Sequence, residues 1–515
     1  MPLTHIFLAL LFLQTHKPGS ISGTVTNAVT GGPVRKAHVT LHSNQNTYTA
    51  TTDAEGHFAV AEVNPGAYTA FVEGAGFRAV PHPEPIRVAE EQQVTNLTFQ
   101  LTPNGVMTGR VLDENGDPMA QISVQAQVET FGRTGRTMST TAAAVTDDRG
   151  MYRFFDLPAG RYFLLAFVPV QAGVVNGRLH TDEVDTAYAS SWFPGVVERS
   201  QATANQLSAG AELSGLDIRL HKVRVYHIRG KAVAQGSQHR LESPVMLTPC
   251  DSAEQGMYAP ILRDGSFEAV DMPAGVWCAV ILETRFDAHG WFARQPVTVT
   301  DHDVNNVVLT ATPLGELRGQ VLIDGEPPTK MQQVQVQFEP LENPGRFVGA
   351  TAQSDGAFRL PEVQPGPYRV ILNLPGAYLK SVRLNGQDTP DPRISVPATG
   401  GQLALLMATD AGEISGTLKG PGQYVTALAA SSPGAISIAA FSAGNGSFVI
   451  RNVPPGDYQV LAWETRDTGL VEYPEFRKQF ESRAVAVTVH SKGHESAALT
   501  AITEAEIEAA RSRLR

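Results

Sequence analysis

A short block of glycine and aromatic residues recurs five times along the chain. In each copy a glycine is followed two residues later by an aromatic residue, and a second glycine with its own aromatic residue follows ten residues further on. The copies are Gly56-Phe58-Gly66-Tyr68, Gly150-Tyr152-Gly160-Tyr162, Gly265-Phe267-Gly275-Trp277, Gly356-Phe358-Gly366-Tyr368 and Gly446-Phe448-Gly456-Tyr458. A fixed internal spacing is the signature of a repeat architecture. We therefore expect five copies of one supersecondary unit.

Each block predicts a β-hairpin. An acidic or amide residue stands shortly before the first glycine, and such a pair provides the side-chain hydrogen bond and the positive φ of a tight turn. These residues are Asp53, Asp147, Asp264, Asp355 and Asn445. A proline before the second glycine then stops the strand, and alternating apolar and polar residues follow, as in a half-buried strand. The two aromatic residues of each block are expected to point into one core.

A second motif, a glycine two residues before Val, Ala or Leu, lies upstream of each block, at Gly23, Gly109, Gly230, Gly319 and Gly416. These glycines are 86, 121, 89 and 97 residues apart, which is the size of a seven-strand antiparallel sandwich. The predicted domains are 20–102, 103–222 with an insertion at 173–210, 223–313, 314–410 and 411–502. The predicted fold class is all-β, with five tandem sandwiches.

Composition excludes several classes of protein. The 515 residues carry a net charge of −11, which argues against a nucleic-acid partner because phosphate binding depends on Lys and Arg. A hydrophobic content of 42% is enough to build cores, so a wholly disordered chain is excluded. Glycine and proline number 47 and 34, which indicates many turns.

The start of the chain resembles a secretory signal peptide. Ile6 to Leu13 is an apolar run of eight residues, far short of the roughly 20 that span a bilayer, so we expect no membrane-spanning segment there. We expect residues 1–19 to direct export to the periplasm, the outer-membrane surface or the medium. No basic residue precedes the run and no Ala-x-Ala site is visible, so a buried first strand or a misassigned start codon are the alternatives.

The two cysteines, Cys250 and Cys278, both fall in the third predicted domain. In an exported protein they could form a disulfide that closes a loop of about 29 residues. The alternative is two buried thiols, because Cys278 lies in the apolar stretch Val276 to Leu282.

These motifs resemble those of the carboxypeptidase regulatory-like domain, a transthyretin-like β-sandwich that is also similar to starch-binding-like modules. The first copy carries the resemblance best, through Thr52 to Phe58 and Asn64 to Tyr68, and the second and fourth copies follow it. The tandem arrangement resembles multi-domain exported proteins common in acidobacteria. The resemblance implies transthyretin-like or Ig-like sandwiches and brings no catalytic domain with it.

The function implied is an exported, non-catalytic binding or scaffold protein of the cell envelope. Family analogy makes a polysaccharide the expected ligand. The alternative is an accessory component of a peptidase or an envelope transport system, which acts by contact with another envelope protein. The sequence indicates no cofactor and leaves the oligomeric state open.

Aromatic residues outside the repeat block are the candidate ligand-binding residues. Aromatic faces cover the apolar face of a sugar ring, and the candidates lie in the insertion and after the third hairpin. They are Tyr188, Trp192, Phe193, Phe286, Trp291 and Phe292. The alternative is that these rings pin long connections to the sandwiches.

No catalytic or metal-binding residues are predicted. His490 and His494 are four residues apart, but a strand-like stretch and a turn surround them, which favours a solvated loop over a helical metal site. Asp113, Asn115 and Asp117 imitate half of a calcium loop, but Pro118 follows directly and a turn is the better interpretation.

The C-terminus departs from the β pattern. In residues 503–515 glutamates come early and arginines late, as the helix dipole favours, so a short C-terminal helix is predicted. Pro474 to Phe480 predicts one or two further helical turns with proline at the first position.

Overall fold

The computed structural model describes residues 17–514 except 82–84, 133–134, 169–185, 251–255, 285–289, 326–333, 342–346, 375, 390–391, 421, 431–436 and 466. The predicted signal peptide therefore lies almost wholly outside the described residues. The chain divides into two compact units, and each is described by itself. Unit 1 comprises Met1–Val128, Thr140–Ala166 and Ser191–Arg219, and unit 2 comprises Glu129–Ser139, Phe167–Ser190 and Leu220–Arg515.

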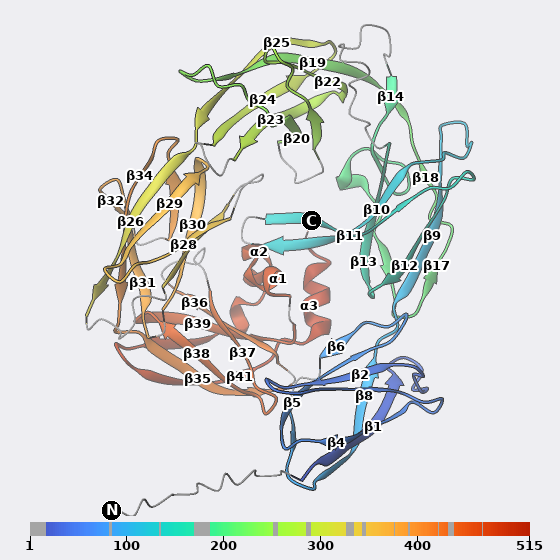
Figure 1. Ribbon diagram of the computed structural model, residues 1–515, viewed down its shortest axis with the longest axis vertical. Coiled ribbons are helices and arrows are strands. Elements are labelled where there is room, and N and C mark those ends of the chain that lie inside the picture. The colour runs from blue at the N-terminus through green and yellow to red at the C-terminus, as the bar shows by residue number, and fades with distance from the viewer. Residues whose placement is uncertain are drawn as a thin grey trace, which may run out of the picture. The chain divides into compact units, whose positions relative to one another are not determined.

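The protein is all-β, and the first sandwich shows the plan (Figure 1). One sheet has the order β4-β1-β8, and the other has the order β3-β2-β5-β6, with β7 also paired to β5. The strands are β1 Gly19–Asn27, β2 His38–His42, β3 Thr47–Thr51, β4 His57–Val63, β5 Gly66–Glu73, β6 Val80–Pro81, β7 Ile86–Val88 and β8 Gln93–Leu101. Phe58 and Tyr68 of the repeat block are both buried between the sheets, as the sequence predicts.

The second sandwich is enlarged by the predicted insertion. The strands are β9 Gly105–Leu112, β10 Ser123–Gly132, β11 Gly135–Val145, β12 Met151–Leu157, β13 Gly160–Phe167, β15 Ser191–Trp192, β16 Asn205–Leu207, β17 Glu212–Leu213 and β18 Ile218–Arg219, with a 3-10 turn η1 at Arg199–Gln201. Two segments of the insertion are built into the sheets of this sandwich, because β15 and β16 both pair with β13. Its residues 173–185 lie outside the described residues.

In the third sandwich the two layers form one continuous sheet, because β24 pairs with both β23 and β25. The strands are β19 Lys222–Ala234, β20 Val245–Pro249, β21 Met257–Ala259, β22 Ser266–Pro273, β23 Gly275–Glu283, β24 Trp291–Val299 and β25 Val304–Pro313. A short strand, β14 (Thr186–Tyr188), adds to β19.

The fourth and fifth sandwiches return to two separate sheets. In the fourth they are β29-β26-β34-β31-β32 and β28-β27-β30-β33, and in the fifth β38-β35-β41 and β37-β36-β39-β40. The strands are β26 Gly315–Asp324, β27 Gln335–Pro340, β28 Val348–Thr351, β29 Ala357–Val363, β30 Gly366–Asn373, β31 Tyr378–Leu384, β32 Gln387–Thr389, β33 Arg393–Val396, β34 Gly400–Ala408, β35 Gly412–Lys419, β36 Tyr424–Ala429, β37 Ile438–Phe441, β38 Ser447–Val453, β39 Gly456–Trp463, β40 Val485–Val489 and β41 His494–Thr500.

The expectation of purely antiparallel sandwiches is wrong in one respect. The first strand of each sandwich pairs in parallel with one or two strands that come late in the same repeat. The parallel pairs are β1 with β8, β9 with β17 and β18, β19 with β25, β26 with β34, and β35 with β41. Hydrophobic alternation within a strand contains no information on the direction of its partner, so the sequence pattern could not distinguish the two pairings.

The repeated turn residues act as predicted. Asp53 accepts hydrogen bonds from the backbone N–H groups of Glu55 (3.1 Å) and His57 (2.7 Å), and Gly56 has a φ of 79°. Asp147 accepts from two backbone N–H groups in the same way. The carboxylate therefore closes the turn together with the backbone hydrogen bond from the N–H of Gly56 to the carbonyl of Asp53.

The second aromatic residue of the block has a polar as well as an apolar role. The hydroxyl or indole N–H of this residue donates a hydrogen bond to the backbone carbonyl four residues earlier. The pairs are Tyr68 to Asn64 (2.7 Å), Tyr162 to Pro158 (2.8 Å), Trp277 to Pro273 (3.1 Å) and Tyr458 to Pro454 (2.8 Å). Tryptophan can replace tyrosine at this position because its indole N–H is also a donor.

Three short helices and a 3-10 turn belong to the last sandwich (Figure 1). They are α1 Thr468–Glu472, α2 Pro474–Lys478, η3 Glu481–Arg483 and α3 Glu504–Arg511. The predicted helical turns at Pro474 and the predicted C-terminal helix are confirmed, whereas α1 is not anticipated. Trp463, Phe476 and Ile507 are buried together, so the helices cover one end of the fifth sandwich. Within the described residues no helix is long and apolar enough to cross a membrane.

Candidate functional site

Both candidate tryptophans are buried. Trp192 in β15 is 2% exposed and Trp291 in β24 is 8% exposed. Their ring faces are packed against the protein and do not form a platform for a sugar ring. Both rings lie in the buried core of their sandwiches.

The remaining candidate residues do not gather on one described surface. Tyr188, in unit 2, is half-buried, and the ammonium group of Lys222 lies 5.2 Å from its ring centroid. Phe193, in unit 1, and Phe292, in unit 2, are also half-buried. Phe286 lies outside the described residues.

Trp291 forms part of a polar cluster in the third sandwich. Its ring stacks on that of His239, with centroids 5.4 Å apart and planes 6° from parallel. The Nε2 atom of His239 lies 2.7 Å from Oε1 of Glu283, the residue opposite Trp291 on β23. The other oxygen, Oε2, accepts from the backbone N–H groups of Glu242 (2.7 Å) and Ser243 (3.2 Å).

Glu283 is a carboxylate with only 4% of its side chain exposed. Burial acts to raise its pKa, but the hydrogen bonds from Glu242 and His239 outweigh burial and hold the pKa of Glu283 below its usual range. The carboxylate therefore stays ionised and connects the segment before β20 to the end of β23. Its geometry serves to hold a loop in place.

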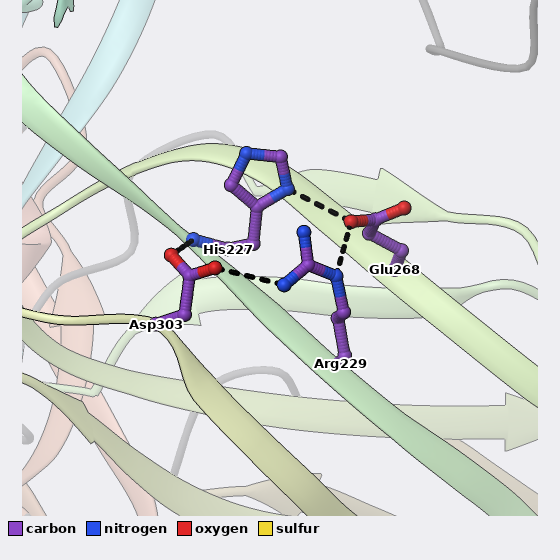
Figure 2. A network of polar contacts seen from close by, with 4 residues as sticks. All are labelled: His227, Arg229, Glu268 and Asp303. Carbon is purple, nitrogen blue, oxygen red and sulfur yellow. Dashed lines mark hydrogen bonds and ion pairs between the residues drawn. The ribbon is translucent and has the colours of Figure 1, made fainter. Parts of the chain in front are cut away.

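A second polar network lies on β19, β22 and the turn before β25 (Figure 2). Oε1 of Glu268 lies 2.6 Å from Nε of Arg229 and 2.8 Å from Nδ1 of His227. Asp303 accepts from Nη1 of Arg229 (2.8 Å) and from the backbone N–H of His227 (2.9 Å). Two carboxylates therefore enclose one guanidinium group, and three segments that are distant in sequence are joined.

Electrostatics in this network favour the charged forms. Burial acts to raise the pKa of Asp303, but the backbone N–H of His227 and the guanidinium of Arg229 lower that pKa overall. The pKa of Arg229 is raised by its hydrogen bonds to Asp303 and Glu268, which outweigh the effect of burial. Glu268 has 4% of its side chain exposed, so the network is partly buried. It joins the first strand, β19, to β22 and to the turn before the last strand, β25. Sequence reasoning missed it, since alternate residues on one strand give no sign of their partners on another.

Cys250 and Cys278 are joined by a disulfide, with their Cα atoms 4.9 Å apart. Cys278 lies in β23 opposite Thr248 of β20, and the backbone N–H of Cys250 donates to the carbonyl of Val276. The bond therefore links two neighbouring strands of the third sandwich.

The residues that resemble metal ligands in the sequence form hydrogen bonds with near neighbours in the chain. His490 lies in the turn after β40, where its Nδ1 is 2.9 Å from Oε1 of Glu495. Asp113 accepts from the backbone N–H groups of Asn115 (2.9 Å) and Asp117 (2.8 Å), which is the geometry of a turn. Among the residues that the structure describes, no group of three or more His, Cys, Asp or Glu side chains could hold a metal ion.

One pocket of unit 2, with a volume of about 290 Å³, is lined by charged side chains. Arg369 and Glu339 line it and are paired with each other, and Glu472 on α1 is paired with Arg477. The charges on its walls thus compensate one another, and none of the predicted aromatic residues lines it.

Comparison with protein families identifies the first sandwich. Residues 20–102 match the model of the carboxypeptidase regulatory-like domain. The resemblance carried by Thr52 to Phe58 and Asn64 to Tyr68 is therefore confirmed for this part of the chain. No curated protein matches the chain.

Several solved structures are similar to parts of the chain at low scores. The Bacillus anthracis TIE protein is 11% identical with a TM-score of 0.16, covering 77% of this chain and 72% of its own. The minor pilin of Streptococcus agalactiae is 12% identical with a TM-score of 0.22, covering 40% of this chain and 96% of its own. The major pilin subunit of Bacillus cereus is 10% identical with a TM-score of 0.16, covering 59% of this chain and 98% of its own. TM-scores this low leave function open.

Proposed function

We propose that this chain, whose first sandwich is a carboxypeptidase regulatory-like domain, is an exported, non-catalytic scaffold protein of the cell envelope. The observation that carries the proposal is that the polar clusters of the third sandwich bind segments of that sandwich to one another. In the third sandwich Glu283, Glu268 and Asp303 all bind backbone N–H groups or basic side chains of other segments. Such contacts stabilise the fold. We propose that the protein functions as this stable framework.

The disulfide supports the export part of the proposal. Disulfides persist in oxidising compartments and are rare in the cytosol. The apolar run Ile6 to Leu13 supports it as well. The test is fractionation of cells that express the full chain with a C-terminal tag. We expect the protein in the periplasmic, surface or extracellular fraction with Cys250 and Cys278 oxidised, and recovery in the cytosol with both thiols reduced would contradict the proposal.

The finer proposal is that the scaffold binds a polysaccharide. Its support is the resemblance to sugar-binding sandwiches and the partial exposure of Tyr188 and Phe292. The test is retention of the full chain on a panel of insoluble and immobilised polysaccharides. Tyr188→Ala and Phe292→Ala are the informative variants, because replacement of the buried Trp192 or Trp291 would disturb the fold. No retention of the wild-type chain by any polysaccharide would favour the rival, an accessory protein that binds another envelope protein.

A further inference from the structure

Five residues other than glycine adopt a left-handed backbone conformation at the same place in each sandwich. They are Glu62 (φ 55°), Asp156 (φ 64°), Asp271 (φ 57°), Glu362 (φ 57°) and Asn452 (φ 58°). Each directly precedes a buried apolar residue near the end of β4, β12, β22, β29 or β38. At this point the pairing with the first strand shifts register, so two residues on one strand lie opposite one on the other.

Glycine is the residue expected at such a position. A side chain on a residue with positive φ crowds its own backbone, and only glycine and, to a lesser degree, asparagine and aspartate adopt this conformation readily. None of the five positions carries glycine, and two of them carry glutamate, which has no such tolerance. A conformational cost that recurs at equivalent positions points to a role for the side chain itself.

In three sandwiches this side chain binds a residue of the preceding sandwich or of the link that follows it. In the second sandwich Oδ1 of Asp156 accepts from Nδ2 of Asn104 (2.9 Å), which lies between β8 and β9. In the fourth, Oε1 of Glu362 accepts from the backbone N–H of Gly290 (2.9 Å), directly before β24 of the third sandwich.

In the fifth sandwich the equivalent residue, Asn452, forms two hydrogen bonds with the preceding sandwich. Oδ1 of Asn452 accepts from the backbone N–H of Gly376 (2.8 Å), and its Nδ2 donates to the carbonyl of Leu374 (3.4 Å). Both partners lie between β30 and β31 of the fourth sandwich. The amide of asparagine suits this arrangement because it donates and accepts at once, whereas a carboxylate only accepts.

The backbone of Gly290 is held on both sides. Its N–H donates to Glu362, and its carbonyl accepts from the N–H of Leu314 (2.8 Å), the residue that precedes β26. Leu314 is buried, and its side chain occupies the space that a Cβ atom on Gly290 would need. The third and fourth sandwiches are therefore joined by apolar packing and by two oriented hydrogen bonds.

We propose that Asp156, Glu362 and Asn452 are junction clips, and that they hold each of their sandwiches at a defined angle to the segment before it. Adjacent domains move relative to one another by default unless their interface prevents it. The clips make the third, fourth and fifth sandwiches a stiff connector. This inference deepens the scaffold proposal and rests on it, because a scaffold that spaces its partners needs fixed junctions.

The test is the distribution of distances between neighbouring sandwiches in the full chain, measured by pulsed electron resonance on pairs of spin labels. Exposed positions suit the labels: Tyr258→Cys with Phe347→Cys reports on the third and fourth sandwiches, and Phe347→Cys with Phe441→Cys on the fourth and fifth. The native cysteines are in the disulfide and do not take up label. Glu362→Gly and Asn452→Gly remove the clips and suit the local φ, so each sandwich should keep its fold. Amide hydrogen exchange of the sandwich strands verifies this.

We expect Glu362→Gly to broaden the first distribution about twofold and Asn452→Gly to do the same for the second. Glu362→Gln keeps an oxygen acceptor and should stay narrow. The matched control is Asp271→Gly, at an exposed residue of the labelled third sandwich with the same backbone conformation. Unchanged distributions in both clip variants, or equal broadening by the control, would overturn the inference. Fractionation of the same variants tests export separately, so failure of the clips and failure of the scaffold proposal are distinguishable.

Discussion

Gly23 of β1 lies directly opposite the buried ring-bearing residue Phe58 of β4. The same pairing of a first-strand glycine with the first aromatic residue of the block occurs in the other four sandwiches. The pairs are Gly109 with Tyr152, Gly230 with Phe267, Gly319 with Phe358 and Gly416 with Phe448. Two motifs that are separate in the sequence thus form one structural unit, in which the glycine leaves space for the ring and for the parallel strand beside it.

Gly23→Ala should destabilise the first sandwich by about 2 kcal/mol, because the added methyl group would overlap the backbone of Leu97 in β8. Amide hydrogen exchange of peptides from β1 and β8 in the full chain measures the loss. Gly32→Ala in the same sandwich is the control, since the nearest atom to its added methyl group is 3.4 Å away. Equal protection in Gly23→Ala and Gly32→Ala would show that the close approach is not required.

Glu283→Gln should weaken the third sandwich by about 2 kcal/mol at pH 7, because a neutral amide oxygen accepts from the backbone N–H groups of Glu242 and Ser243 more weakly than a carboxylate and gives His239 no charged partner. The pKa of Glu283 is lowered by folding, so its contribution is complete above the ordinary glutamate pKa of about 4.3 and is lost as the pH falls through the lower folded value. The difference between wild type and variant should therefore shrink below about pH 4. Hydrogen exchange of peptides from β23 and β24 at both pH values measures this. A difference that is independent of pH would mean that the carboxylate charge is not involved.

Reduction of the Cys250–Cys278 disulfide should cost the third sandwich about 3–4 kcal/mol, because the bond closes a loop with a sequence separation of 28 residues. Cys250→Ser with Cys278→Ser should reproduce the effect of reductant. Intact mass without reductant should show the loss of two hydrogen atoms relative to the reduced chain. Urea unfolding with and without reductant measures the stability, and an identical midpoint in both conditions would contradict the prediction.

Thr503→Ala should destabilise α3 by about 1 kcal/mol, because the side chain of Thr503 accepts from the N–H of Glu506 and the carboxylate of Glu506 binds the N–H of Thr503 in return. Faster hydrogen exchange in α3 would report the loss. Thr503→Ser keeps the hydroxyl and should retain protection. If both variants exchange alike, packing of Ile507 rather than the cap holds the helix.

The hairpins could be predicted from the sequence because their signals are local. Asp53 and Gly56 form a turn because the side chain, the backbone N–H groups and the positive φ all lie within five residues. The same holds for the capped helix α3, whose signals lie within one turn. The burial of Phe58 and Tyr68 follows from alternation along a strand, which the sequence also displays.

The surroundings of the candidate site residues could not be predicted from local sequence patterns. Trp192 and Trp291 stand outside the repeat block, so the sequence leaves them free to be exposed, and only the packing of β15 and β24 buries them. Glu268 and Arg229 come together across strands 39 residues apart in sequence, and nothing near either residue indicates the partner.

The sequence by itself determined the repeat block, its turns, its core aromatic residues and the short C-terminal helix, because each of these depends on residues that are neighbours in the chain. Tertiary structure alone decided the parallel pairing of first and last strands, the burial of the two tryptophans and the contacts of Glu362 and Asn452 with the preceding sandwich. These depend on which segments meet, and the clip contacts join residues 72 and 76 positions apart in the chain. The direction and partner of a strand are set by the free energy of packing the whole sandwich, which no short segment contains.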